Sequence, residues 1–334
     1  MAGLILGIET SCDDTAAAVV SADLRVHANV VSRQLEAHDR YGGVVPELAS
    51  RIHTSEIMPV VARALEEAGV AGADLSAIAV TRGPGLAGSL LVGISAAKAL
   101  SLAWGVPLIP VNHLDAHLAS AHLGDEPVVF PCLVLLVSGG HTMLARMDGP
   151  TALSVLGRTR DDSAGEAFDK VARMMDLGYP GGPVIDRLGA TGTPCIDLPR
   201  PMLHSPDLDV SFSGLKTAVA RQLRAEPDTA VPDLCASFTA ALMDVLDKKL
   251  RKALKAGDYQ SISVVGGVAA NRVLRARLAA LSASRGVRIC MPPRGLEMDN
   301  GAMIAAAAWL AGGPEAAGGL RFGAAPNLAL GAPA

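Results

Sequence analysis

Two segments of this chain share one plan, in which a short apolar strand, a polar turn and a second apolar strand follow one another. The first segment spans residues 4–20, with its polar turn at residues 9–14. The second spans residues 132–145, with its turn at residues 138–142. Repetition of this unit about half a chain apart suggests a duplicated domain. The pattern by itself leaves two unrelated hairpins as the alternative.

Helical and strand-like stretches alternate after each of these units. Residues 57–68 have helical periodicity and precede a strand-like run at 77–80, and a long amphipathic stretch at 234–254 precedes another such run at 262–265. Such alternation predicts an α/β fold. The 334 residues are enough for two domains of ordinary size.

The charge of the chain gives no overall sign of nucleic-acid binding, because the net charge is −4. An RNA contact would therefore need a local basic surface. Basic residues crowd the helix predicted at 234–254 and the helix expected after residue 271, although such runs are also typical of a solvated face. We expect two or three of the following to meet phosphates: Lys248, Lys249, Arg251, Arg272, Arg275 and Arg277.

Cysteine usage and hydropathy point to a cytoplasmic protein. The five cysteines are scattered and form no Cys-x-x-Cys pair, which favours reduced thiols. The N-terminal apolar run lacks a basic region before it and ends in an acidic cluster, unlike a signal peptide. The most apolar stretch, residues 86–111, is interrupted by Lys98 and by Gly, Ser and Pro. We therefore predict a buried helix and a strand there, and no membrane span.

Two histidines four residues apart, His113 and His117, would lie on one face of a helix. Both imidazoles could then reach one metal ion, and a distant aspartate such as Asp299 could add an oxygen ligand. The alternative is a helix with two hydrogen-bonded histidines. A zinc peptidase needs a glutamate directly after the first histidine, and Leu114 stands there. A protease centre is therefore disfavoured.

Three glycine pairs are suited to a phosphate group, because glycine permits positive φ and close backbone approach. They occur at residues 139–140, 181–182 and 266–267, each expected at the end of a strand or helix. Each could instead be a plain turn. The chain lacks the P-loop pattern, which disfavours a Walker ATPase. It has one Gly-x-Gly-x-x-Gly run, at residues 83–88, but such a run alone is weak evidence, and a Rossmann dehydrogenase is also disfavoured.

Seven longer motifs together resemble the tRNA N6-adenosine threonylcarbamoyltransferase family, the bacterial TsaD subunit formerly labelled O-sialoglycoprotein endopeptidase. The resemblance covers roughly residues 4–311, in order and without large gaps. The motifs lie at residues 7–15, 41–51, 113–117, 136–142, 165–170, 211–217 and 299–304.

The resemblance implies an actin/hexokinase/Hsp70-like α/β fold with two duplicated domains around a nucleotide and metal cleft. Accordingly, we expect an N-terminal domain at residues 1–125 and a C-terminal domain at residues 126–300. Residues 301–334 should form a helix and tail that pack back on the first domain.

The resemblance also implies a site. His113, His117 and Asp299 match the family's ligands to one divalent metal ion, usually iron and sometimes zinc. The substrate's phosphate region is expected at Leu136, Val137, Ser138, Gly139 and Gly140, and its adenosine at Asp169, Gly182, Asp186 and Asn271. The general base is not evident, and Asp13 and Asp14 are the candidates.

The reaction implied is transfer of the threonylcarbamoyl group from threonylcarbamoyl-AMP to the N6 amine of the adenosine immediately 3′ of the tRNA anticodon. AMP would be released. The implied protein partners are a TsaB-like paralogue of the same fold and a TsaE-like P-loop ATPase. Three alternatives share some of these features: a small-molecule kinase of the same fold, a metalloprotease, and a non-enzymatic nucleotide-binding scaffold.

Overall fold

The computed structural model describes residues 3–39 and 41–334, which divide into two compact units. The first unit contains Met1–Asp125, Pro150–Ala152 and Pro292–Ala334, and the second contains Glu126–Gly149 and Leu153–Met291. Residues 292–300, which we had assigned to the C-terminal domain, thus belong to the first unit. They do so because they lead directly into a helix that packs on the first sheet.

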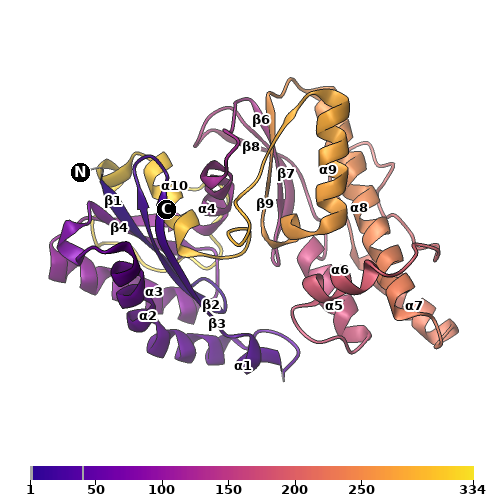
Figure 1. Cartoon of the computed structure of the whole chain (residues 1–334), viewed down its shortest axis with the longest axis horizontal. Helices are drawn as coiled ribbons and strands as arrows, with labels where there is room; N and C mark the ends of the chain where they lie inside the picture. Colours follow the sequence, from indigo (N-terminus) through magenta and orange to yellow (C-terminus); the bar gives the residue numbers. More distant parts are fainter. Residues whose placement is uncertain (1–2, 40) are drawn as a thin grey trace. The chain divides into compact units, whose positions relative to one another are not determined.

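The first unit is built on a five-stranded mixed sheet (Figure 1). Its strand order is β3-β2-β1-β4-β5, with β1, β2 and β3 antiparallel and β4 and β5 parallel to β1. The strands are β1 (Leu4–Glu9), β2 (Asp14–Ser21), β3 (Val26–Arg33), β4 (Ala77–Gly83) and β5 (Leu108–Asn112).

The sheet of the second unit repeats this topology strand for strand. Its order is β10-β9-β6-β7-β8, with an antiparallel β6-β7-β8 meander and with β9 and β10 parallel to β6. The duplication predicted from the two strand–turn–strand segments is therefore confirmed, and each segment forms the first hairpin of its sheet. The strands are β6 (Cys132–Val137), β7 (Thr142–Met147), β8 (Leu153–Arg158), β9 (Ser261–Val265) and β10 (Arg288–Cys290).

Helices cover both faces of the first sheet (Figure 1). Alternate residues of β1 point to opposite faces: Leu6 packs with α2 and α3, whereas Ile5 packs with α10. Both faces are therefore buried, which explains why the middle of β1 and the middle of β2 carry no polar side chain. The helices are α1 (Leu35–Asp39), α2 (Pro46–Ala68), α3 (Ala87–Trp104), α4 (His113–Ser120) and α10 (Gly301–Leu310), with short 3₁₀ turns η1 (Gly72–Asp74), η2 (Ala121–Leu123) and η4 (Gly313–Ala316).

Helix α3 is the apolar stretch for which we predicted a buried helix. Among the described residues it is the one helix long and apolar enough to cross a membrane. Its inner face, which includes Leu90, Ile94 and Ala97, is buried in the core against the sheet and α2. That packing is typical of a core helix, and the strand expected after it is β5.

The second unit has a single large core between its sheet and its helices. Phe168 of α5 and Phe238 of α8 meet edge to face there, with ring centroids 5.2 Å apart, a preferred aromatic geometry. The helices are α5 (Ala164–Met174), α6 (Gly181–Gly189), α7 (Ser213–Ala225), α8 (Val231–Ala256) and α9 (Arg272–Arg285), with a 3₁₀ turn η3 (Gly267–Ala270).

The basic run of α8 is not the open surface that the sequence suggested. Lys249 has no exposed surface, and its Nζ lies 2.6 Å from Ser205 Oγ and 3.0 Å from the Asp207 carbonyl oxygen. A buried ammonium needs such partners, so Lys249 fastens the loop before α7. The prediction that Lys249 meets phosphate is wrong. Arg251 pairs with Asp247 in the same helix at 2.7 Å.

Two glycines let α10 begin directly against the first sheet. A Cβ on Gly7 would lie 2.2 Å from the Gly301 carbonyl oxygen, and a Cβ on Gly301 would lie 2.4 Å from the Ala18 backbone nitrogen. Side chains at these positions would push the helix away from the strands. Because Asp299 precedes α10 by two residues, this close approach also determines where its carboxylate lies.

We expect Gly301→Ala to destabilise the protein by about 2–3 kcal/mol, since the added methyl group overpacks a backbone contact that cannot relax cheaply. Urea denaturation measures the change. The control is Gly323→Ala, where a Cβ meets no atom within 4 Å, and we expect a change below about 0.5 kcal/mol there. Equal stability of the two variants would contradict this account of the contact.

Candidate metal centre and nucleotide-binding loops

Helix α4 follows β5 without a loop and carries both histidines. Asn112 is its N-cap, and the side-chain Oδ1 accepts a hydrogen bond from the Leu114 backbone N–H at 2.9 Å. Asparagine is among the best residues for this role. His113 and His117, one turn apart, are both buried, and their ring centroids are 4.7 Å apart.

The third predicted ligand reaches the same place from the segment before α10. Asn300 fixes this segment: its Oδ1 accepts from the Met303 N–H at 3.0 Å and its Nδ2 donates to the Met298 carbonyl at 2.7 Å. Asp299 Oδ1 then lies 3.2 Å from His117 Nε2 and 3.7 Å from His113 Nε2. The structure thus brings the three residues together, with one ligand atom from each within 4.8 Å of the others.

The environment of His117 fits a metal ligand. Both of its ring nitrogens are buried and make no hydrogen bond to any described residue. Buried polar atoms without a partner are rare and call for an explanation. Nε2 also approaches Asp299 Oδ1 to 3.2 Å without hydrogen-bond geometry. Two nitrogens and a carboxylate oxygen that converge in this way are suited to a divalent cation such as zinc or iron.

A buried carboxylate that the sequence analysis missed holds His113. Glu9, at the end of β1, has no exposed surface, and its Oε2 lies 3.0 Å from His113 Nδ1. Thr81 Oγ1 donates to the same oxygen at 2.6 Å, and the Ser11 backbone N–H donates to Oε1. If Nδ1 carries the proton shared with Glu9, the lone pair of Nε2 faces Asp299, the usual arrangement behind a metal-bound histidine.

Glu9 and His113 each stabilise the charged form of the other. Burial works against ionised Glu9, but the charge of His113 and its hydrogen bond outweigh burial and hold the pKa of Glu9 below its ordinary value. Burial also works against protonated His113, yet the charges of Glu9 and Asp299 raise the pKa of His113 to about 9. A proton and a metal ion would therefore compete for His113.

The two candidate bases lie where the turn after β1 leads into β2. Asp14, the first residue of β2, is buried, and burial together with the charges of Asp299 and Asp13 raises the pKa of Asp14 to about 8. The turn is fastened by buried His53, which contacts the Cys12 carbonyl oxygen at 3.0 Å and Thr15 Oγ1 at 2.7 Å.

The first glycine loop of the second unit joins β6 to β7. Ser138 closes it, since its N–H donates to the His141 carbonyl at 2.8 Å and its Oγ accepts from the His141 N–H at 3.1 Å. The Gly165 N–H donates to the Ser138 carbonyl at 3.3 Å, so the loop lies at the start of α5. Gly139 and Gly140 are exposed, with open space where a Cβ would be.

Leu136 and Val137 were expected in the loop that binds the substrate, but they lie in a buried strand. Both are residues of β6, and both are completely buried in the structure. Their side chains belong to the core because the strand is covered on both faces. Only their backbone atoms remain available for a substrate.

The residues expected to hold adenosine lie around α6 and the start of α9. Asp169 Oδ1 accepts from the Gly181 N–H at 2.8 Å and so fixes the start of α6. Asp186 of α6 accepts from Asn271 Nδ2 at 3.1 Å, while Asn271 Oδ1 caps α9. Gly182 has open space at its Cβ position. The structure thus brings Asp186 and Asn271 together, and it places Asp169 at the other end of α6.

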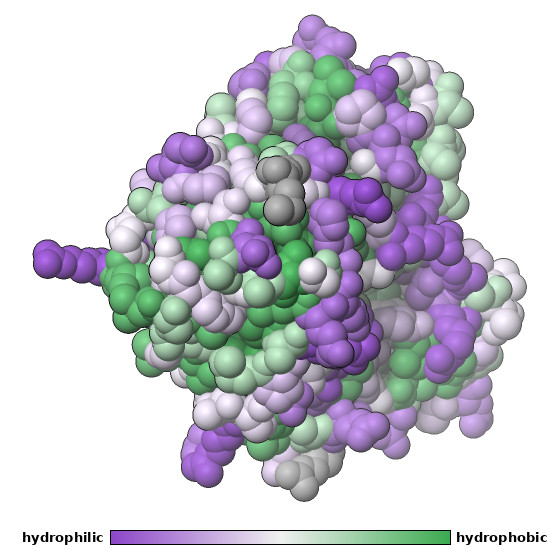
Figure 2. Space-filling model, turned by 60° about the vertical axis from the view of Figure 1, so that its left-hand side comes forward, coloured by the Kyte–Doolittle hydropathy of each residue, from purple (hydrophilic) through white to green (hydrophobic). Residues whose placement is uncertain are grey.

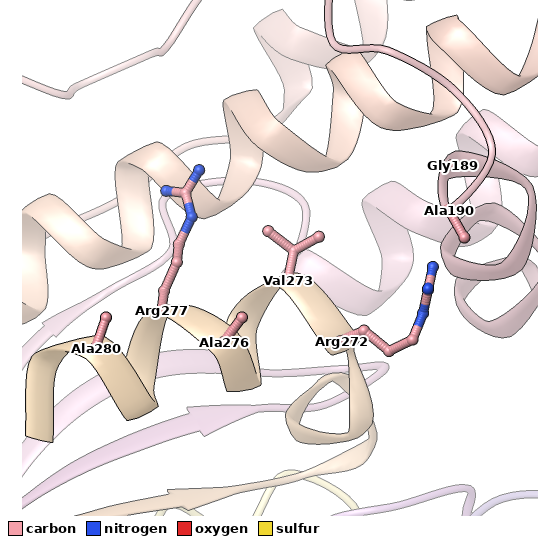
Figure 3. Close-up of a pocket in the computed structure, with 7 residues that line it drawn as sticks. All are labelled: Gly189, Ala190, Arg272, Val273, Ala276, Arg277 and Ala280. Atoms are coloured by element: carbon pink, nitrogen blue, oxygen red, sulfur yellow. The ribbon is translucent and has the colours of Figure 1, made fainter. Parts of the chain in front are cut away.

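A groove with a volume of roughly 420 Å³ lies beside the Asp186–Asn271 pair, between the end of α6 and α9 (Figure 3). Small side chains line it, and Arg272 extends along it toward Ala190 at the end of α6. Arg272 is paired with Asp186 at 2.8 Å, and Arg277 with Asp244 at 2.7 Å. Two of the four arginines expected to meet phosphates, Arg272 and Arg277, are therefore paired with carboxylates within the protein.

Comparisons of sequence identify the family. The family described as TsaD, tRNA N6-adenosine threonylcarbamoyltransferase, matches residues 25–306. A protein of that name from Trichlorobacter lovleyi is 52% identical over 309 residues, which cover 91% of this chain and 90% of that protein. One from Salinibacter ruber is 54% identical over 313 residues, covering 91% of this chain and 93% of the relative.

Comparisons of structure identify the fold. HypF from T. kodakarensis superposes with a TM-score of 0.58 at 14% identity, covering 93% of this chain and 47% of that one. Component A of (R)-2-hydroxyglutaryl-CoA dehydratase from Acidaminococcus fermentans gives 0.56 at 17% identity, covering 92% and 98%. These neighbours share the actin/hexokinase/Hsp70-like fold, which confirms the fold expected from the sequence. The chain is a member of the tRNA N6-adenosine threonylcarbamoyltransferase family, a family of enzymes that modify tRNA.

Proposed function

We propose that this enzyme transfers the threonylcarbamoyl group from threonylcarbamoyl-AMP to the N6 amine of the adenosine immediately 3′ of the tRNA anticodon. The new N–C bond replaces the bond between the carbamoyl carbon and the phosphate oxygen, the amine loses a proton, and AMP leaves. The observation that carries this proposal is the match to the transferase family over residues 25–306. Convergence of His113, His117 and Asp299 within the same fold supports it.

We infer that His113, His117 and Asp299 hold one divalent metal ion, with iron favoured by the resemblance and zinc as the alternative. When bound, such an ion would supply a Lewis acid that orients and polarises the substrate. Glu9 contributes by holding the ring of His113 and keeping its proton on Nδ1. His117 needs a ligand at a nitrogen because its ring has no hydrogen-bond partner among the described residues.

The loop at Ser138, Gly139 and Gly140 is suited to the phosphate of the substrate and of the departing AMP. Its glycines leave room for close approach, and backbone N–H groups can form an anion-binding nest. Leu136 and Val137 would contribute backbone atoms only. The nucleoside would be held by Asp169, Gly182, Asp186 and Asn271, where the carboxylates and the amide can bond ribose hydroxyls and the base.

Asp14 is the better of the two candidate bases. A group that accepts a proton near neutral pH works best when its pKa is close to that pH, and burial beside other carboxylates brings the pKa of Asp14 to about 8. A cation bound at Asp299 would offset part of that repulsion and shift the pKa further toward neutrality. In this proposal Asp13 helps to raise the pKa of Asp14 through its negative charge.

The partners we propose are tRNA, a TsaB-like paralogue and a TsaE-like P-loop ATPase, all in the cytoplasm. Large apolar side chains are exposed on the outer side of α2 and α3, at Met58, Leu91 and Leu102. Figure 2, which turns the left-hand side of Figure 1 forward, shows hydrophobic residues among hydrophilic ones on that face. Exposed apolar side chains contribute more to protein interfaces than to contacts with nucleic acid. This surface is suited to the paralogue rather than to tRNA.

The alternatives explain less. A small-molecule kinase of this fold has no use for the histidine pair and Asp299. A metalloprotease lacks its base, because Leu114 follows the first histidine and its side chain is buried. A non-enzymatic scaffold does not account for a complete set of ligand atoms.

We expect the His113→Ala/His117→Ala double variant to lose stoichiometric metal and most transferase activity while it keeps its fold. The loss follows from removal of both nitrogen ligands. The assay is nucleoside mass spectrometry of tRNA incubated with threonylcarbamoyl-AMP and the partner proteins. His27→Ala, at an exposed position of β3, is the matched control and should behave like the wild type. Full activity of a metal-free double variant would refute the metal assignment.

The loop assignment predicts that Gly139→Val abolishes the stabilisation that a nucleotide gives to the protein. At a hundredfold excess of AMP over its Kd, the wild type should gain about 2.7 kcal/mol, measured by thermal denaturation. The structure has open space for the new side chain, so the variant should fold. Gly323→Val, at another position with open space, is the control. Undiminished stabilisation of Gly139→Val by AMP would show that the nucleotide binds elsewhere.

A further inference from the structure

We propose that residues 320–331 form a strap that positions helix α4, and with it both histidine ligands. Asn112 and Asp115 are the positioning residues on which the strap acts. The importance of the strap for metal binding rests on the proposed metal site, but the strap itself is defined by its contacts within the first unit.

The strap is anchored first on the end of β4. The Ala325 N–H donates to the Arg82 carbonyl at 2.9 Å, and Arg82 Nε donates to the Gly323 carbonyl at 3.1 Å. A Cβ on Gly83 would lie 1.9 Å from the Ala325 carbonyl oxygen. The strap therefore runs directly against the strand, at a place where only glycine leaves room for it.

A second anchor lies on α3. The ring of Phe322 packs on the core of the first unit, and the ammonium of Lys98 lies 4.6 Å from the ring centroid. Lys98 Nζ also donates to the Phe322 carbonyl oxygen. Apolar burial and a cation–π contact together hold this part of the strap against the core and α3.

The far end of the strap is tied to the first turn of α4 on both sides of His113. Asn112 Nδ2 donates to the Ala329 carbonyl at 2.6 Å, while its Oδ1 caps the helix. The Gly331 N–H donates to Asp115 Oδ1 at 3.0 Å. One amide thus serves both the cap and the strap, so displacement of the strap would disturb the start of the helix.

The middle of the strap contacts the loop after β4, which in turn contacts the turn beside His113. The Gly85 N–H donates to the Pro326 carbonyl at 3.1 Å, and the neighbouring Leu86 N–H donates to the Ser11 carbonyl at 2.7 Å. Ser11 Oγ lies 3.2 Å from His113 Nδ1. The strap therefore contacts both the start of α4 and the loop next to the turn that borders the His113 ring.

A helix of eight residues, such as α4, is too short to be stable alone. The contacts at its ends must therefore determine its direction and its position along the helix axis. Metal coordination tolerates only small errors in ligand position. Two hydrogen bonds from one strap to the first turn provide that constraint, and they come from a part of the chain that is remote in sequence.

The test severs both ties in the full-length protein. Asn112→Ser keeps a good N-cap but is too short to reach Ala329, and Asp115→Ala removes the acceptor for Gly331. We expect the double variant to bind Co²⁺ about tenfold more weakly, with a changed visible spectrum of the bound ion. Faster amide hydrogen exchange in both α4 and residues 325–331 should accompany this. The control Asp115→Asn keeps the acceptor oxygen and should match the wild type.

A second variant probes the strap from its distant anchor. Phe322→Ala leaves α4 untouched, and we expect it to speed amide exchange in α4 as well as in the strap. Unchanged exchange in α4 in both this variant and the double variant would overturn the proposal. If the wild type binds no Co²⁺, the metal site is wrong, and the strap is judged by amide exchange alone.

Discussion

The hydrogen bonds of the buried Glu9 carboxylate are the interactions on which the proposed metal centre depends. A charge with no exposed surface at the end of a central strand is costly unless its oxygens are bonded. Thr81 from β4, the Ser11 backbone and His113 from α4 supply those bonds. One side chain therefore ties the central strand, its parallel neighbour and the histidine helix together. Removal of any one of these partners would leave the buried charge of Glu9 without one of its hydrogen bonds.

The duplicated architecture lets the two units carry different chemistry on the same plan. In both, a polar turn joins the first two strands: Glu9, Ser11 and the acidic pair lie in or next to the turn after β1, and the turn after β6 is the glycine loop. The first unit adds the candidate metal ligands through α4 and the segment before α10. The second adds carboxylates and an amide through α6 and α9. The proposed metal site and the proposed nucleotide site therefore draw on residues of separate units.

Sequence patterns predicted the elements whose signal is local and periodic. The repeated hairpins and the histidine pair at helical spacing are of this kind, whereas no spacing singled out Asp299, and its choice among the distant aspartates rested on the family resemblance. Glu9 was missed because it looked like one more acid in a polar turn, and burial of a single carboxylate depends on partners from β4 and α4. Lys249 was misjudged for the same reason: its partners lie in a loop more than forty residues earlier. Polar contacts between residues far apart in the sequence produce no periodic pattern in the sequence.

The most direct test of this account is the metal affinity of Glu9→Gln. The amide has nearly the shape of the carboxylate but no charge to hold the Nδ1 proton of His113. We expect Co²⁺ or Fe²⁺ to bind about 10- to 100-fold more weakly than to the wild type. Glu36→Gln, an exposed acid on α1, should leave affinity unchanged. Wild-type metal affinity in Glu9→Gln would contradict the claim that Glu9 orients His113 for a metal ion.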